Sequence, residues 1–140
     1  YPKMQEALRA AGIDLAHTDV DLREYIYDMP TVMRAADLVI CRGGASTISE
    51  LTALGMPSII VPSPYVVNNH QEKNARVLEK NGAAVVIREN ECDGDSLYEA
   101  AKQLLSDRER CRAMRSAAAN LAVVDAAERI YQTALELSRH

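Results

Sequence analysis

Three short apolar runs, separated by segments with helical periodicity, constrain the fold of this chain most strongly. The runs are predicted strands at Leu38–Cys41, Ser58–Val61 and Ala84–Ile87. They are apolar almost throughout, as a sheet covered on both faces requires. Strands that alternate with helices are joined by right-handed crossovers and lie parallel. The sequence therefore predicts an α/β fold with a Rossmann-like parallel sheet flanked by helices.

Helix signals around these runs predict the covering layers. The predicted helices are Lys3–Ala11, Thr31–Ala36, Ser46–Leu54, Asn69–Asn81, Gly94–Ser106, Arg108–Leu121 and Asp125–Ser138. Three of them stop at Gly12, Gly55 or Gly82, and glycine is a common residue just past a helix end. A further short strand is expected over Asp21–Ile26. No repeat or internal linker appears, so residues 1–140 are expected to form a single domain.

Composition bounds the class of protein. A chain of 140 residues that is 48% hydrophobic can bury one core. Its 20 acidic and 16 basic residues give a formal charge of -4, which argues against nucleic acid as a partner. Three widely spaced cysteines without a metal-binding pattern, and no signal peptide, favour a cytoplasmic location. No apolar run approaches the ~18 residues of a membrane span.

A glycine pair follows the first of the main predicted strands, within the segment RGGASTISE at residues 42–50. In open parallel sheets, ligands bind beyond the carboxyl ends of the strands. A helix start there offers unpaired N–H groups and partial positive charge, which suit phosphate. Gly43 and Gly44 would let the backbone approach an anion, and Ser46 and Thr47 would add hydroxyl donors. Neither GxxxxGK[ST] nor GxGxxG is present.

The same segment also permits a purely structural interpretation. Thr47 and Glu50 have the spacing of a capping box, in which both side chains satisfy N–H groups of their own helix. Glu50 lies about 200° around the helix from Ile48, so it points away from the buried stripe. It is therefore either a solvated acid near the helix start or an acceptor for the paired hydroxyls of a sugar.

A cluster of polar residues follows the next strand, in the segment NNHQEKN at residues 68–74. Amides both donate and accept hydrogen bonds, which suits neutral polyols. The alternative is an asparagine helix cap followed by solvated residues. Because the carboxyl ends of parallel strands share one edge, these residues are expected beside the glycine turn.

Signals for metal binding and for hydrolysis are weak. The two D-x-D patterns, at residues 19–21 and 93–95, are best interpreted as a solvated strand entry and as a turn with a helix cap. No Ser–His–Asp set can be assembled from spacing. The sequence therefore predicts no metal site and gives only weak support to a hydrolase.

A resemblance covers nearly the whole chain. The stretch YIYDMPTVMRAADLVICRGGASTISELTALGMPSIIVPSPYVVNNHQEKNARVLEKNGAAVVI, and more weakly VVDAAERIYQTALEL, resembles the carboxy-terminal lobe of the bacterial peptidoglycan glycosyltransferases of family 28. These enzymes have the GT-B architecture of two Rossmann-like lobes. The resemblance implies transfer of N-acetylglucosamine from UDP-N-acetylglucosamine to a lipid-linked acceptor, lipid I, giving lipid II with inversion. This lobe would supply donor binding.

The resemblance also implies roles for particular residues. Ile26 would contact uracil through its backbone, Ala45–Thr47 would hold the diphosphate, and Glu50 would accept from the ribose hydroxyls. His70 and Gln71 would contact the sugar, with Asn74 nearby. The full set of donor-binding residues implied in this way is Ile26, Gly44, Ala45, Ser46, Thr47, Glu50, His70, Gln71 and Asn74.

The resemblance also implies which parts of the full-length protein lie outside this chain. The acceptor lobe and the first strands of this lobe are expected to be absent, so the chain alone is expected to be inactive. No cofactor would be required, although a divalent cation would be stimulatory. The full-length protein would be peripheral on the cytoplasmic face of the inner membrane. Alternatives are a GT-B transferase with another acceptor, a noncatalytic nucleotide-sugar-binding subunit, or a Rossmann-like fragment without a ligand site.

Overall fold

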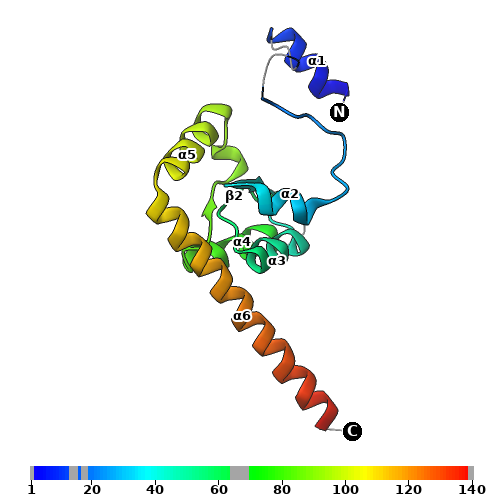
Figure 1. Cartoon of the computed structure of the whole chain (residues 1–140), viewed down its shortest axis with the longest axis vertical. Helices are drawn as coiled ribbons and strands as arrows, with labels where there is room; N and C mark the ends of the chain where they lie inside the picture. The colour runs from blue at the N-terminus through cyan, green and yellow to red at the C-terminus, as the bar shows by residue number, and fades with distance from the viewer. Residues whose placement is uncertain (1, 13–15, 17–18, 64–69, 139–140) are drawn as a thin grey trace.

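The computed structural model describes residues 2–12, 16, 19–63 and 70–138. Figure 1 shows an α/β body with helix α1 (Pro2–Ala10) set apart from it. The long helix α6 (Arg108–Ser138) packs on the body through its first half and projects beyond it with its second half. The sheet and the helices that cover it form the body, between these two extensions.

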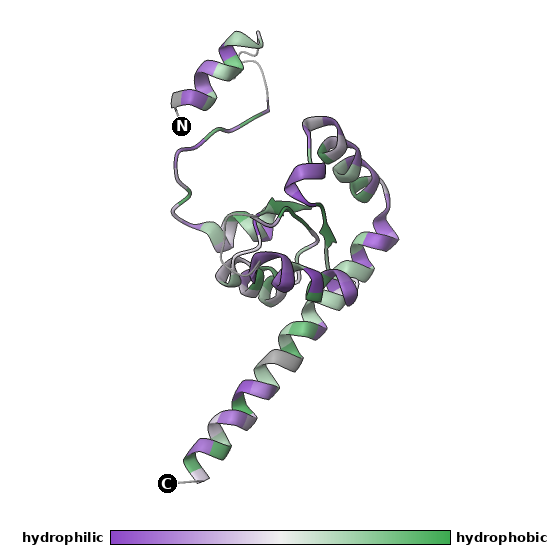
Figure 2. Ribbon diagram, turned by 180° about the vertical axis from the view of Figure 1, so that it is seen from behind, coloured by the Kyte–Doolittle hydropathy of each residue, from purple (hydrophilic) through white to green (hydrophobic). Residues whose placement is uncertain are grey.

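Three parallel strands form the sheet of the body. They are β1 (Val39–Cys41), β2 (Ser58–Ile60) and β3 (Val85–Val86). Their spatial order is β1-β2-β3, and Ile40 pairs with Ile59 while Ile60 pairs with Val86. Figure 2 shows these strands as the most uniformly hydrophobic part of the chain. The predicted parallel sheet is thus confirmed, with each strand shorter than predicted.

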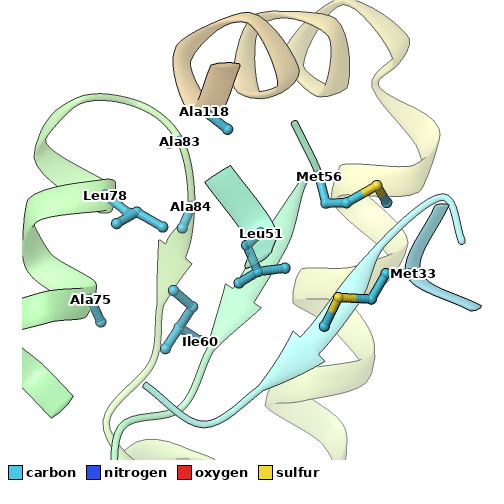
Figure 3. Close-up of a cluster of buried hydrophobic side chains, with 9 residues drawn as sticks. All are labelled: Met33, Leu51, Met56, Ile60, Ala75, Leu78, Ala83, Ala84 and Ala118. Atoms are coloured by element: carbon cyan, nitrogen blue, oxygen red, sulfur yellow. The ribbon is translucent and has the colours of Figure 1, made fainter. Parts of the chain in front are cut away.

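Helices cover both faces of the sheet. Successive residues of β2 point to opposite faces, so each face has apolar side chains to bury. Ile60 packs in a cluster with residues of α2 (Met29–Ala35), α3 (Ala45–Leu54) and α4 (His70–Lys80). Figure 3 shows this cluster: Met33, Leu51, Met56, Ile60, Ala75, Leu78, Ala83, Ala84 and Ala118. Ile59 packs on the other face against Leu104 of α5 (Gly94–Ser106) and Met114 of α6. Each fully buried isoleucine contributes about 1.5–3 kcal/mol.

The predicted helix ends are well placed. Gly12, Gly55 and Gly82 all adopt positive φ, which confirms them as helix stops. Asp93 caps α5: its carboxylate accepts from the Ser96 N–H at 2.7 Å. The Ser96 hydroxyl in turn accepts from the Asp93 N–H. A short 3-10 turn, η3 (Glu89–Glu91), separates β3 from α5.

Two sequence predictions are wrong. The expected strand over Asp21–Ile26 pairs with no described strand; the segment runs as an irregular connection, and Arg23 bonds to the nearby Asp21 carboxylate instead. The two helices expected over 108–121 and 125–138 are one helix, α6. No glycine or proline interrupts residues 108–138, and an interior aspartate costs only about 0.7 kcal/mol in helix propensity relative to alanine. Among the described residues, no helix is long and apolar enough to cross a membrane.

Candidate functional site

The candidate site lies where β1 and β2 end. Arg42, Gly43 and Gly44 lead from β1 directly into α3, and Val61 to Ser63 follow β2 at the same edge. The Val61 N–H donates to the Cys41 carbonyl at 2.8 Å, which holds the two strand ends side by side. This edge is where a parallel sheet leaves room for a ligand.

The N-cap residue of α3 has no side chain. It is Gly44, with φ -63 and ψ 145, so the cap residue itself makes no side-chain hydrogen bond to the helix. The first i→i−4 bond runs from the Ile48 N–H to the Gly44 carbonyl at 3.0 Å, so the N–H groups of Ala45, Ser46 and Thr47 precede it. The capping-box interpretation is wrong, because Thr47 is the third residue of the helix and not its cap. The helix start is therefore open to an external acceptor.

A pocket of about 740 Å³ opens beside this helix start. It brings together four of the predicted site residues, Ile26, Ser46, Thr47 and Glu50, from segments that are far apart in the sequence. The other lining residues are Arg23, Glu24, Tyr25, Met29, Val32, Met33, Ala36, Leu38, Val39, Ile40 and Cys41. Its size lies within the range of small-molecule sites, about 300–1,000 Å³. Both polar and apolar side chains thus line the pocket.

The start of α4 is tied to the glycine turn by Gln71. Its side-chain Oε1 accepts from the Gly43 N–H at 3.2 Å and from the Ser63 N–H at 2.8 Å. Gly43 is buried, and a Cβ there would lie 2.7 Å from the backbone oxygen of Gln71. The expectation that Gly43 leaves room for an anion is therefore wrong, because that space is filled by α4. Gly44 does leave room, since a Cβ there would meet nothing within 4 Å.

The Arg42 side chain connects the ends of all three strands at this edge, through an ion pair and a hydrogen bond. The Arg42 guanidinium, after β1, donates to the Glu89 carboxylate at 2.8 Å, after β3. It also donates to the Val61 carbonyl at 3.4 Å, after β2. The pair is partly exposed, so its contribution to stability is about 0–1 kcal/mol. Its geometric effect is to fix where the glycine turn leaves the sheet.

The remaining predicted residues are not among those that line the pocket. Gly44 and Ala45 belong to the open helix start, and Ala45 is exposed. His70 is the exposed first residue of α4, and Asn74 is half-buried one turn further on. The polar residues Asn68 and Asn69 lie outside the described residues. The assignment of the nine residues to donor binding stays a prediction.

Sequence reasoning missed Tyr25 as a pocket residue. Tyr25 is 67% exposed and lies with its ring centroid 4.9 Å from that of Tyr27, in an edge-to-face arrangement. The signal was available in the triplet YIY, where an aromatic residue stands on each side of Ile26. Cys41 also lines the pocket, and burial raises the pKa of its thiol to about 11. Cys41 therefore stays protonated at neutral pH.

The described residues do not form a metal-binding cluster. Among them, no three His, Cys, Asp or Glu side chains are placed to hold a metal ion. Of the two D-x-D patterns, Asp93 is a helix cap, as predicted, and Asp21 pairs with Arg23.

These features define a class of protein. A parallel α/β fold with an uncapped helix start beside a pocket at the carboxyl ends of its strands is typical of nucleotide-binding domains. The particular family follows from comparison with known proteins. The chain belongs to the glycosyltransferase family 28 C-terminal domain family, whose model matches residues 3–130.

Similar proteins agree with this assignment. A protein of Acetivibrio thermocellus is 49% identical over 122 residues, which cover 87% of this chain and 33% of that protein. One of Bacillus licheniformis is 44% identical over 140 residues, covering 100% of this chain and 37% of that protein. Both are named UDP-N-acetylglucosamine–N-acetylmuramyl-(pentapeptide) pyrophosphoryl-undecaprenol N-acetylglucosamine transferase. The chain thus spans about a third of the length of the curated relatives it matches.

Solved structures confirm the fold class. The crystal structure of Acinetobacter baumannii MurG matches with a TM-score of 0.70 and 31% identity, covering 81% of this chain and 33% of that one. The glycosyltransferase SsfS6 of Streptomyces sp. SF2575 matches with a TM-score of 0.59 at 23% identity, and so shows a shared fold alone. The predicted fold, a carboxy-terminal lobe of a GT-B glycosyltransferase, is confirmed.

Proposed function

We propose that this chain is the donor-binding lobe of an enzyme that transfers N-acetylglucosamine from UDP-N-acetylglucosamine to lipid I, giving lipid II. One observation carries the proposal: the uncapped start of α3 adjoins a pocket in which Ile26, Ser46, Thr47 and Glu50 lie together. A diphosphate needs hydrogen-bond donors, a ribose needs an acceptor for its hydroxyls and a base needs apolar contacts, and these residues supply each kind of group. The relatives' names supply the donor sugar and the acceptor.

Each part of the donor has a group suited to it. The N–H groups of the first turn of α3 and the hydroxyls of Ser46 and Thr47 bind the diphosphate. The Glu50 carboxylate accepts from the paired ribose hydroxyls, and the backbone of Ile26 contacts uracil. The sugar extends toward the start of α4, where His70, Gln71 and Asn74 stand.

The proposed reaction develops negative charge next to this helix start. The acceptor hydroxyl attacks the anomeric carbon, and the bond from that carbon to the diphosphate oxygen breaks with its electron pair leaving on UDP. The hydroxyl proton passes to a base on the other lobe. Negative charge thus grows on the diphosphate, where preorganised N–H groups stabilise it without reorganisation. This is consistent with a donor lobe that holds no catalytic residue of its own.

No metal ion is required in this proposal. The positive end of α3 and the hydroxyl donors take the role that a divalent cation has in other sugar transferases. We expect the affinity for UDP-N-acetylglucosamine to change less than twofold when EDTA is added, with Mg²⁺ at most stimulating transfer. A loss of binding in EDTA that Mg²⁺ restores would contradict this part of the proposal. With its lipid-linked acceptor, the whole enzyme would work at the cytoplasmic face of the inner membrane.

Titration of the ¹⁵N-labelled chain with UDP-N-acetylglucosamine, UDP-glucose and UMP tests donor binding. We expect amide shifts at residues 43–50 for the UDP-sugars, added shifts at residues 70–74 from the sugar, and weaker binding of UMP. Ser46→Ala and Ser49→Ala form a matched pair, because both serines lie on α3 and only Ser46 lines the pocket. We expect several-fold weaker binding for the first alone. A folded chain whose residues 43–50 do not shift contradicts the proposal.

A further inference from the structure

Gln71 joins two loops that lie at the carboxyl ends of neighbouring strands. Its Oε1 accepts from the Gly43 N–H at 3.2 Å, in the turn after β1, and from the Ser63 N–H at 2.8 Å, in the loop after β2. The donors are 28 and 8 residues away in sequence. A single side-chain oxygen therefore sets the distance between the glycine turn, the loop after β2 and the start of α4.

This oxygen is fully engaged by the protein itself. A carbonyl oxygen has two lone pairs, and the two N–H groups occupy both. Gln71 is half-buried, and Gly43 is buried against the backbone of Gln71, so the contact has little freedom to open. A ligand hydroxyl could bond to this oxygen only by displacing one of the two N–H donors. The Nε2 amide, which only donates, is the part of Gln71 that remains for a ligand.

We propose that Gln71 is a positioning residue, which acts on donor binding by holding the Gly43–Gly44 turn in the geometry that presents the start of α3. The inference rests on the proposed function, and it deepens the expectation that Gln71 contacts the sugar. Gly44 follows Gly43 directly and is the N-cap of α3, so a shift of Gly43 moves the first turn of the helix. Loss of the Gln71 oxygen must then weaken binding of the diphosphate, which Gln71 does not touch.

The first experiment needs no ligand. Amide hydrogen exchange at Gly43 and Ser63 is measured in the 140-residue chain, in Gln71→Met and in Gln71→Glu. Methionine fills the space without an acceptor, whereas a glutamate oxygen keeps both hydrogen bonds. We expect exchange at both amides to be roughly tenfold faster in Gln71→Met, the effect of losing about 1.4 kcal/mol per hydrogen bond. We expect Gln71→Glu to restore wild-type protection. Unchanged exchange at both amides in Gln71→Met overturns the proposal.

The second experiment separates positioning from sugar contact. Binding of UDP and of UDP-N-acetylglucosamine is measured calorimetrically for the wild-type chain and for Gln71→Met. Positioning predicts that the affinity for UDP, which lacks the sugar, falls by about tenfold, and that the affinity for UDP-N-acetylglucosamine falls by at least the same factor. A role in sugar contact alone weakens UDP-N-acetylglucosamine, leaves UDP unaffected, and overturns the proposal.

The two experiments also distinguish a failure of the proposed role of Gln71 from a failure of the proposed function. A folded wild-type chain that binds neither UDP nor UDP-N-acetylglucosamine rejects the proposed function, and the amide exchange data then decide alone whether Gln71 holds the turn. If Gln71→Met does not fold, Gln71→Asn replaces it in both measurements. Its side chain is one methylene shorter and cannot span both donors, so the same outcomes support or overturn the proposal.

Discussion

The replacement Gly43→Ala probes the contact that shapes the glycine turn. A Cβ at this position would lie 2.7 Å from the backbone oxygen of Gln71 and 3.2 Å from its carbonyl carbon and its Cβ, whereas ordinary contacts begin at 3.4 Å. The turn and α4 would have to separate by about 0.7 Å. The obstacle is backbone, so no change of side-chain rotamer can relieve it.

The size of the effect follows from this geometry. Forced separation in a packed region costs about 1–3 kcal/mol. The bonds from Gly43 and Ser63 to the Gln71 oxygen would be stretched, and each contributes about 0.5–1.5 kcal/mol. The expected loss of unfolding free energy is therefore about 2–4 kcal/mol. For a chain of this length, that lowers Tm by about 5–12 °C.

Gly44→Ala is the matched control. Gly44 has φ -63 and ψ 145, which any residue adopts, and a Cβ there would meet nothing within 4 Å. Alanine is a poorer N-cap than glycine but lowers the entropy of the unfolded chain, so we expect a net change within about 1 kcal/mol. The added methyl group lies at the open helix start. Gly44→Ala should therefore lose affinity for UDP while keeping its stability.

Thermal and urea unfolding of the two variants, with calorimetric titration of UDP, make the comparison. The expected result is that Gly43→Ala loses stability and, indirectly, some affinity for UDP, whereas Gly44→Ala loses affinity for UDP while it keeps its stability. In the combined Gly43→Ala, Gln71→Ala variant, the losses should be less than additive by about 1 kcal/mol, because both changes remove the same hydrogen bonds. Equal melting of Gly43→Ala and Gly44→Ala would refute the close approach of the turn to α4.

Three further predictions concern single side chains. Glu50→Ala should weaken UDP binding by about tenfold or more, because hydrogen bonds to a charged acceptor are lost, while Tm changes by less than about 2 °C. A larger loss of stability with unchanged binding would contradict a role of Glu50 in ligand binding. Cys41, whose thiol has its pKa raised by burial to about 11, should be alkylated at pH 8 about 100-fold more slowly than in the urea-unfolded chain, and faster as pH rises. Hydrogen bonds from Ser96 hold the pKa of Asp93 below its usual value, so its contribution to stability is present above about pH 4 and lost as pH falls through the lowered pKa. Asp93→Asn, which keeps an acceptor without titrating, should therefore show a weaker loss of stability between pH 5 and pH 2.5.

The fold was largely predictable because its signals are local. The apolar runs around Ile40, Ile59 and Val86 each marked a strand, and Gly55 and Gly82 marked helix ends that the backbone confirms. Alternation of strand and helix then left a parallel sheet as the simplest arrangement. The errors arose where the local signal was ambiguous. Residues 21–26 could be extended without a partner strand, and helix α6 could pass through Asp125 without a break.

The candidate site was predictable only in outline, because its decisive contacts are not local. The strand ends and the helix start at Gly44 follow from the sequence pattern, and they placed Ser46 and Thr47 correctly at the first turn of α3. The packing of α4 against Gly43 does not follow from the sequence pattern, because it joins residues 28 apart through one oxygen of Gln71. Two adjacent glycines that look equivalent in sequence are therefore different: Gly43 is required by the protein's own packing, and Gly44 alone leaves space for a ligand.

This difference changes how variation in the turn should be interpreted. A substitution at the first glycine acts on stability and on α4, so its loss of binding is indirect. A substitution at the second acts where the diphosphate is proposed to lie, so its loss of binding is direct. The Arg42–Glu89 pair and Gln71 both brace the first position from outside the proposed pocket. These contacts from β2, β3 and α4 hold the turn in place, which is what preorganised binding of the proposed diphosphate at the first turn of α3 requires.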